Sequence, residues 1–224
     1  MCGRFARYSD VQEYAGRFGV KAGFTLTPRY NIAPSQALLL ARNAPEGGRQ
    51  LVALTWGLVP AWSKEPRTSY STFNARAETV AEKPAFRAAF RQRRCLITAD
   101  GYYEWKQEGT GKQPYFIRLK SRAPFAFAGL WEEWAPRAGQ EAERLATCTI
   151  IVTAANDLTR PIHDRMPVIV PPTLYDAWMD PALRDPARLL PMLQPYPAEF
   201  MEAYPVSTRV GNVRNEGAGL IERV

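Results

Sequence analysis

Histidine and cysteine are scarce in this chain, which has one histidine and three cysteines among 224 residues. Cys2, Cys95 and Cys148 are odd in number and widely spaced, so they suggest neither a disulfide framework nor the paired pattern of a zinc site. Cys95 and Cys148 lie in the apolar runs CLIT and CTIIV, and we expect both to be reduced core residues. The sequence therefore predicts no metal ion and no cofactor.

Long apolar runs, internal repeats and linker-like stretches are also missing. No segment approaches the ~20 apolar residues that a membrane-spanning helix needs. The first residues, MCGRFARYSD, lack the apolar region of a signal peptide. We therefore expect one domain over residues 1–224, forming a cytoplasmic monomer with no membrane partner.

Basic residues outnumber acidic ones, with 29 Lys and Arg against 22 Asp and Glu and a formal net charge of +7. The excess is spread along the chain and is mostly arginine, whose planar guanidinium suits fork-like contacts to phosphate. A basic balance of this size favours a polyanionic partner, and nucleic acid is the commonest one.

Nineteen prolines imply many turns and argue against long helices. Many short strand-like segments, without βαβ alternation, predict an α+β fold with a mainly antiparallel sheet or open barrel-like core and short peripheral helices. Ser9 is the expected N-cap of a first helix that ends at Gly19. Further short helices are expected over residues 84–93, 174–179, 181–193 and 198–203, and a final strand over 205–210.

Cys2 is the residue with the most distinctive chemistry. Aminopeptidases remove Met1 when a small residue follows it, which would leave Cys2 with a free α-amine next to its thiol. The amine titrates near ~7.7–8.0 and the thiol near ~8.5, so both are partly nucleophilic at neutral pH. Such a 1,2-aminothiol can attack an aldehyde twice, first as a Schiff base and then by closing a thiazolidine ring. The alternative is that Cys2 is an accident of position, since chain termini are commonly unimportant.

Two further titratable residues stand in chemically suggestive surroundings. Glu104 lies between aromatic residues in GYYEWK, where desolvation would raise its pKa toward the range of a general acid. His163 lies in the Pro-flanked segment RPIHDRMPV beside Asp164 and Arg165, where a neutral imidazole could move protons. A surface glutamate and a structural histidine are the alternatives.

A long loop rich in aromatic, Pro and Ser residues supplies the remaining candidates. Asn74 and Arg76 come from STFNARAET, where an amide can fix a reactive group and a guanidinium can hold a phosphate. Trp56 and Trp62 come from WGLVPAW. A tryptophan exposed on a loop can stack on bases or wedge between them, and we expect this of Trp62, with Trp56 in the core.

Taken together, these segments closely resemble the SRAP (SOS-response-associated peptidase) family, whose members act as abasic site processing proteins. The matching segments are MCGRFA, RYNIAPSQ, WGLVPAW, FNARAET, CLITADGYYEWK, QPYFI, FAFAGLWE, IVTAAN, IHDRMPV and PVSTRVGNVRNEG. Each motif alone is modest, but the ordered set covers nearly the whole chain and has cysteine at position 2, which makes it highly specific.

The resemblance implies the SRAP fold and a set of catalytic residues. It makes Cys2 the nucleophile, Asn74 and Glu104 polar groups of the active site, and His163 the acid/base. The DNA-binding residues that it implies are Arg4, Asn31, Pro34, Trp62, Arg76, Thr153 and Arg165. Trp62 matches a position that separates the bases beside the lesion; some relatives have a second aromatic residue directly after it, where this chain has Ser63.

The resemblance also implies the activity. Cys2 would form a covalent thiazolidine crosslink with ring-opened abasic sites in single-stranded DNA, shielding the lesion during the DNA damage response, with the protein on the nucleoid when bound. AP-lyase activity and a thiol autopeptidase step that exposes Cys2 are further implications. Two alternatives stay open: a thiol peptidase acting on other proteins through Cys2, His163 and Asn74, and a non-covalent module that binds single-stranded DNA.

Overall fold

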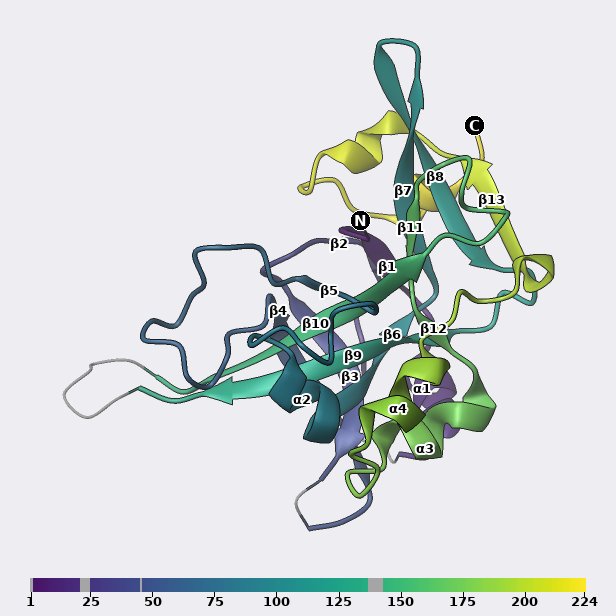
Figure 1. Ribbon diagram of the computed structural model, residues 1–224. Helices are drawn as coiled ribbons and strands as arrows, with labels where there is room; N and C mark the ends of the chain where they lie inside the picture. The colour runs from purple at the N-terminus through teal and green to yellow at the C-terminus, as the bar shows by residue number, and fades with distance from the viewer. Residues whose placement is uncertain (1, 21–24, 45, 137–142) are drawn as a thin grey trace.

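The computed structural model describes residues 2–20, 25–44, 46–136 and 143–224 (Figure 1). The strands are β1 Phe5–Arg7, β2 Arg29–Ile32, β3 Ala37–Asn43, β4 Arg49–Trp56, β5 Asn74–Arg76, β6 Arg94–Ala99, β7 Gly101–Glu108, β8 Gly111–Leu119, β9 Phe125–Trp134, β10 Leu145–Ala154, β11 Arg165–Pro167, β12 Ile169–Val170 and β13 Met201–Pro205. The α-helices are α1 Val11–Phe18, α2 Arg87–Gln92, α3 Tyr175–Met179 and α4 Pro186–Leu189. The 3₁₀ helices are η1 Pro172–Leu174, η2 Leu190–Met192, η3 Ala198–Phe200, η4 Thr208–Gly211 and η5 Ala218–Ile221.

Five strands close into a barrel. Neighbouring strands pair in the order β10, β4, β3, β6 and β9, and β9 pairs back onto β10. Most pairs are antiparallel, but β10 runs parallel to β4 and to the short strand β5. The predicted α+β class with a mainly antiparallel, barrel-like core is therefore confirmed. The β9–β10 pairing makes the barrel closed, and it carries no free edge at that point.

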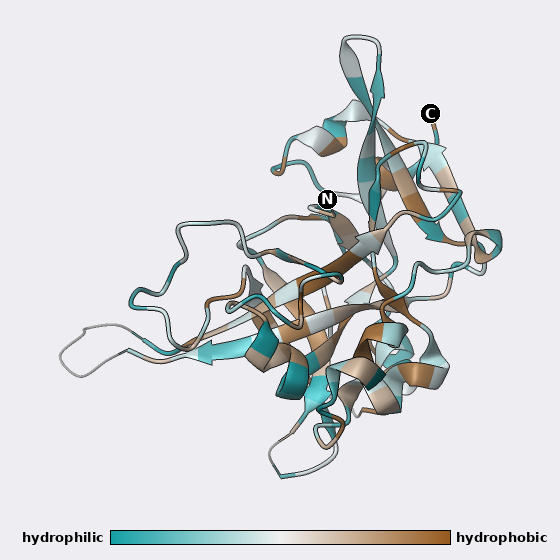
Figure 2. Ribbon diagram, in the orientation of Figure 1, coloured by the Kyte–Doolittle hydropathy of each residue, from teal (hydrophilic) through white to brown (hydrophobic). Residues whose placement is uncertain are grey.

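The interior of the barrel is packed with apolar side chains, as the brown strands at the centre of Figure 2 indicate. Side chains alternate between the two faces of a strand, and Ile97 and Phe127 are among those fully buried in the same cluster as Cys95 and Cys148. The prediction that both cysteines are core residues is confirmed. Gly129 leaves no room for a side chain, because a Cβ atom there would lie 2.7 Å from the Cys95 Sγ.

A second sheet brings the two ends of the chain together, in the order β13, β8, β7, β1 and β2. Strand β1 lies between β7 and β2, with Phe5 opposite Tyr102 on one side and opposite Ile32 on the other. In Figure 1 this sheet stands above the barrel, with the β7–β8 hairpin extending away from it. The residues that precede β1 therefore run alongside β7, and this pairing fixes their position in the fold.

The first helix follows the predicted pattern apart from its cap. Asp10 is the N-cap of α1, and its carboxylate accepts a hydrogen bond from the Gln12 N–H at 2.7 Å. Ser9 was the expected cap, but its hydroxyl donates to Asp100 instead, at 2.5 Å. Gly19 ends the helix with a φ of 65°, a conformation that glycine adopts without steric cost.

The last third of the chain differs more from expectation. The α-helical part of the predicted helix over 181–193 is only Pro186–Leu189, followed by a 3₁₀ turn. The predicted helix over 198–203 is wrong after Phe200, because Met201–Pro205 forms β13 on the free edge of β8. The predicted strand over 205–210 is also wrong, because the pairing of β13 with β8 ends at Pro205 and Thr208–Gly211 forms a 3₁₀ helix. Edge pairing is non-local and overrides local propensity.

Helices cover the lower part of the barrel, where α1, α3 and α4 gather in Figure 1. They pack apolar side chains such as Phe18, Tyr175 and Trp178 on the outer face of the barrel strands. Within the described part of the chain, every helix is too short or too polar to cross a bilayer.

Asp100 ties β1 to the helix that follows it. Its buried carboxylate accepts hydrogen bonds from the Tyr8 N–H, the Ser9 N–H and hydroxyl, and the Tyr14 hydroxyl. Replacing Asp100 with alanine leaves these donors without an acceptor, so we expect the free energy of unfolding to fall by about 3 kcal/mol. Urea unfolding measures the change. Asp157→Ala, at a side chain that is 97% exposed, is the control, and equal effects in the two variants would contradict this role.

Candidate active site

Cys2 lies in the interior at the meeting point of both sheets. The Tyr103 N–H donates to the Arg4 carbonyl at 3.0 Å, so the segment before β1 continues along β7. The Cys2 side chain is fully buried and packs in the same cluster as the barrel interior. The Asn74 Nδ2 donates to the Cys2 carbonyl at 2.7 Å. The chain's beginning is therefore held between β7 and β5, and is part of the packed structure.

Asn74 reaches Cys2 because β5 pairs with β10, with Asn74 opposite Ile150 and Arg76 opposite Val152. The Asn74 Oδ1 is buried and has no hydrogen-bond partner among the described residues. An amide oxygen in this position is an acceptor for a donor that comes close to Cys2, such as an amine.

Glu104 is a buried carboxyl group on β7. Its residue is 3% exposed, and burial, with a smaller contribution from the charge of Asp164, raises its pKa to about 7. The predicted desolvation is confirmed, and a surface position is excluded. Tyr102 lies two residues earlier on the same face of β7 and is fully buried in the cluster that contains Cys2. Burial raises the pKa of its hydroxyl, and the charges of Cys2 and Glu104 add to this effect.

His163 lies in the turn between β10 and β11, where its backbone N–H donates to the Thr159 carbonyl at 2.9 Å. The Arg165 N–H donates to the His163 Nδ1 at 3.0 Å. A ring nitrogen that accepts a hydrogen bond carries no proton, so Nε2 carries the proton in the neutral ring. Burial lowers the pKa of His163, which keeps the imidazole neutral near pH 7. An Asp164 carboxylate oxygen, 2.9 Å from Nδ1, would stabilise the protonated ring.

Glu104 and His163 line one cavity of about 450 Å³. It is lined by Gly3, Arg4, Glu104, Trp105, Lys112, His163 and Gly211. Glu104 and His163 therefore share a cavity with Gly3, the residue next to Cys2. Sequence reasoning missed Lys112, which lies opposite Gln107 across the β7–β8 hairpin. Only the strand register places it here.

The Cys2 thiol is neutral at physiological pH in this environment. Burial raises its pKa well above the ordinary value, and the charge of Glu104 adds to the effect. A neutral thiol must lose its proton when it attacks carbon, so a base has to take that proton. A carboxyl group with a pKa of about 7 and a neutral imidazole are both suited to proton transfer at pH 7.

Arg4 and Asn31 join the beginning of the chain to its end. Arg4 donates to the Asn31 Oδ1 at 2.6 Å and to the Val210 and Gly211 carbonyls at 2.6 and 3.0 Å. Asn31 is fully buried, and its Nδ2 donates to three carbonyls of the C-terminal segment. Both side chains have a structural role in the free protein, and their contact with DNA stays a prediction.

The other predicted phosphate contacts differ in exposure. Arg76 is exposed at the end of β5, while Thr153 is buried on β10 opposite Met166. Arg165 is half-buried and forms an ion pair with Glu78. A DNA phosphate would therefore reach Arg76 directly, whereas at Arg165 it would compete with a carboxylate.

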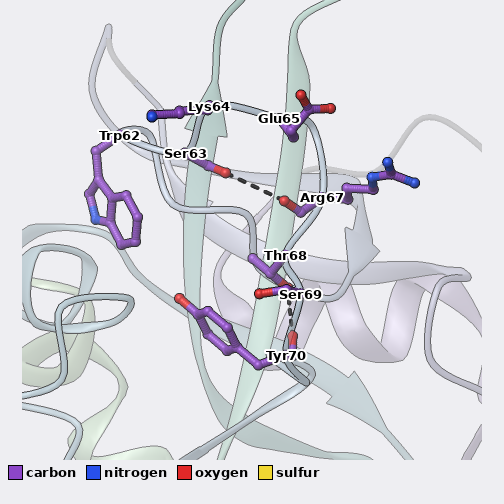
Figure 3. A pocket seen from close by; sticks show the side chains of 8 residues that line it. All are labelled: Trp62, Ser63, Lys64, Glu65, Arg67, Thr68, Ser69 and Tyr70. Atoms are coloured by element: carbon purple, nitrogen blue, oxygen red, sulfur yellow. Dashed lines mark hydrogen bonds between the residues drawn. The ribbon is translucent and has the colours of Figure 1, made fainter.

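The two tryptophans of WGLVPAW differ in exposure, as predicted. Trp56 is 1% exposed in the barrel interior, while Trp62 is 57% exposed on the loop between β4 and β5. The Trp62 indole N–H donates to the Pro84 carbonyl at 3.3 Å, which ties the ring to the turn before α2. Pro34 is half-buried and lines a cavity together with residues of the same loop. More than half of the Trp62 side chain is thus open to a ligand (Figure 3), although its indole N–H is bound.

A metal centre is not built into the described ranges: no group of three or more His, Cys, Asp or Glu side chains gathers there.

Comparison with known proteins gives a family match. The family model for SOS response associated peptidase (SRAP) matches residues 1–213. The chain is 44% identical over 226 residues to abasic site processing protein YoaM of Bacillus subtilis, covering 99% of this chain and 98% of that protein. It is 34% identical over 232 residues to abasic site processing protein YedK of Escherichia coli, with both chains fully covered. A crystal structure of a protein from Bacteroides thetaiotaomicron superposes with a TM-score of 0.87 at 26% identity and full coverage of both chains.

Proposed function

The chain belongs to the SOS response associated peptidase (SRAP) family, and on that premise we propose that Cys2, exposed by removal of Met1, captures abasic sites in single-stranded DNA as a covalent thiazolidine. Its relatives YoaM and YedK are named abasic site processing proteins. The observation that carries the proposal is the position of Cys2, whose backbone Asn74 holds beside the cavity that contains Glu104 and His163.

The chemistry follows from the aldehyde that an abasic sugar exposes when its ring opens. The Cys2 amine adds to the aldehyde carbon, and loss of water gives a Schiff base. The Cys2 sulfur then forms a bond to the same carbon while the C=N π electrons move to nitrogen. The thiol gives up its proton and the nitrogen gains one, so the closed ring is neutral and no oxidant or reductant is needed.

Each polar residue has a task in these steps. Glu104, which has a pKa of about 7, donates the proton that opens the sugar ring and helps water to leave during Schiff-base formation. His163 is neutral and moves protons at the sugar. Asn74 positions Cys2 through its carbonyl and offers its buried Oδ1 to the amine. Alignment of amine, thiol and aldehyde in one site replaces a bimolecular encounter.

The Schiff base also permits cleavage of the DNA strand. Its C=N bond acidifies the adjacent carbon of the sugar, so a base can eliminate the 3′ phosphate. AP-lyase activity is thus part of the proposal as a side reaction, in competition with thiazolidine closure. A thiol autopeptidase step would be a second route to the free Cys2 amine, beside removal of Met1 by an aminopeptidase.

Denaturing gel electrophoresis tests the proposed function. The purified protein, shown by mass spectrometry to lack Met1, is incubated with a single-stranded oligonucleotide that carries one abasic site. We expect a shifted band that survives denaturation, and none with an intact oligonucleotide of the same sequence. Absence of the shifted band with the abasic strand would overturn the proposal.

A thiol peptidase acting on other proteins would use the same Cys2 and His163 but would not need a free α-amine. Acetylation of the amine separates the two functions. It should abolish adduct formation with the abasic strand while sparing hydrolysis of a peptide substrate. Peptide hydrolysis by the acetylated protein, without capture of abasic DNA by the unmodified one, would favour the peptidase.

Arg76 is the predicted phosphate contact that lies most open to DNA. Replacing it with alanine should weaken binding of single-stranded DNA and reduce the slope of log K against log salt by about 0.7, since one phosphate contact is lost. Fluorescence anisotropy at several salt concentrations measures this slope. Arg188→Ala, at an exposed arginine of α4, is the control. A slope unchanged by Arg76→Ala would remove Arg76 from the path of the DNA.

A further inference from the structure

A buried hydroxyl group on β7 has no task in the chemistry described so far. Tyr102 is fully buried, and its hydroxyl oxygen has no hydrogen-bond partner among the described residues. A hydroxyl that is removed from water without gaining a partner destabilises the folded state. Because such groups are rare in folded proteins, this one calls for a partner that appears only when the protein acts.

The strand register places Tyr102 beside the beginning of the chain. The Tyr103 N–H donates to the Arg4 carbonyl at 3.0 Å, so the segment that holds Cys2 runs along this part of β7. Side chains alternate along a strand, which puts Tyr102 and Glu104 on one face of β7 and Tyr103 on the other. Tyr102 accordingly packs in the same interior cluster as Cys2, whereas Tyr103 belongs to a separate cluster.

The Cys2 sulfur is the reacting atom that this hydroxyl can serve. Burial raises the pKa of the Cys2 thiol, and the charge of Glu104 adds to this effect, whereas a hydrogen bond from the Arg4 backbone N–H lowers it. Burial also raises the pKa of Tyr102, and the charges of Cys2 and Glu104 contribute to the rise. The Tyr102 hydroxyl therefore keeps its proton at neutral pH and remains a hydrogen-bond donor.

Ring closure is the step in which such a donor matters. The sulfur is a neutral thiol before it attacks, and it bears negative charge after its proton has passed to a base and before its bond to carbon is complete. In an interior without water, an O–H group stabilises this charge more strongly than it would in solution. Tyr102 keeps its own proton throughout, so the bonds formed and broken in the closure stay the same.

We propose that the Tyr102 hydroxyl donates a hydrogen bond to the Cys2 sulfur while the thiazolidine ring closes, which makes Tyr102 a further catalytic residue. The inference rests on the proposed function, because the sulfur attacks carbon only if Cys2 captures the aldehyde. The hydroxyl acts on closure and leaves formation of the Schiff base unchanged. It lacks a partner in the free protein because the charge that it stabilises arises only during the reaction.

The test compares two products of the same Schiff base. Tyr102→Phe removes the hydroxyl and keeps the ring, and an end-labelled single strand with one abasic site shows the thiazolidine adduct and the cleaved strand on one gel. Their ratio compares elimination with closure. We expect the ratio of cleaved strand to adduct to rise about 10- to 100-fold, because a hydrogen bond to a charged atom is lost. Trapping with borohydride at early times should show Schiff-base formation at the wild-type rate.

Tyr175→Phe is the matched control, because Tyr175 is a buried tyrosine of α3 that packs on the outer face of the barrel. It should change neither the product ratio nor the rate of trapping. Tyr102→Phe should unfold at the same or a higher urea concentration than the wild type, since it removes a buried hydroxyl without a partner. An unchanged product ratio, slower Schiff-base formation or a lower urea midpoint in Tyr102→Phe would overturn the proposal.

Failure of this inference differs from failure of the proposed function. If only the role of Tyr102 is wrong, the wild type and Tyr102→Phe both form the adduct, with the same proportion of cleaved strand. If covalent capture is wrong, the wild type itself forms no adduct with the abasic strand, and both proposals fall together.

Discussion

Cys2→Ala eliminates the adduct that survives denaturation, while leaving weak binding to single-stranded DNA. The variant keeps the α-amine but has no sulfur, so a Schiff base can form and the thiazolidine cannot. Schiff bases hydrolyse in water, and no covalent band should survive the gel. We expect the loss to be complete, because Cys95 and Cys148 are buried in the barrel interior and neither lines the cavity of Glu104 and His163.

Two further measurements sharpen this result. Borohydride reduces a Schiff base to a stable amine, so its addition should restore a covalent band for Cys2→Ala. Cys148→Ala is the control, because this buried cysteine belongs to the barrel interior and should form the adduct as the wild type does. An undiminished adduct in Cys2→Ala without borohydride would show that another group captures the lesion.

Glu104→Gln should slow adduct formation by about 10²- to 10⁴-fold, the range typical of a general acid or base. Glutamine keeps the shape of the side chain but cannot give up or take a proton. In the wild type, the step that needs protonated Glu104 should slow as the pH rises past its pKa of about 7. Single-turnover rates between pH 5.5 and 8.5 measure both effects, and the variant should lack this part of the profile.

The same substitution has a consequence for stability whose sign is fixed by the raised pKa. Between the ordinary value of 4.5 and about 7, the folded state binds a proton that the unfolded state has lost, so stability decreases as pH rises through this window. Above pH 7 the buried carboxylate costs the fold about 3 kcal/mol relative to an exposed one. Glu104→Gln should therefore unfold at higher urea than the wild type at pH 8, and the gain should vanish at pH 4.

Glu108→Gln controls both measurements, because Glu108 is exposed at the far end of the same strand. It should leave the capture rate and the urea midpoint unchanged. A Glu104→Gln variant that captures abasic DNA at the wild-type rate would assign the proton transfer to His163 alone.

Comparison of particular residues shows how far the sequence predicts this site. Glu104 was expected to be desolvated because aromatic residues flank it, and its burial confirms this. Lys112 was missed, because its position across the β7–β8 hairpin leaves no mark in the local sequence. Ser9 was taken for the helix cap, because nothing in the sequence shows that Asp100 draws it away from the helix.

The sequence by itself determined what depends on covalent structure and local order. It established the aminothiol that Cys2 can present, the kinds of side chain that could assist it, the excess of positive charge and the many short strands. These follow from the identity of each residue and its near neighbours. Such properties do not change when distant segments of the chain move relative to one another.

Only the tertiary structure decided whether these groups meet. The pairing of β1 between β7 and β2 carries Cys2 into the interior, and the parallel pairing of β5 with β10 brings Asn74 to it. Burial then raises the pKa of Glu104 to about 7. Strand pairing and desolvation both depend on residues far away in the chain, so neither is encoded in any single motif.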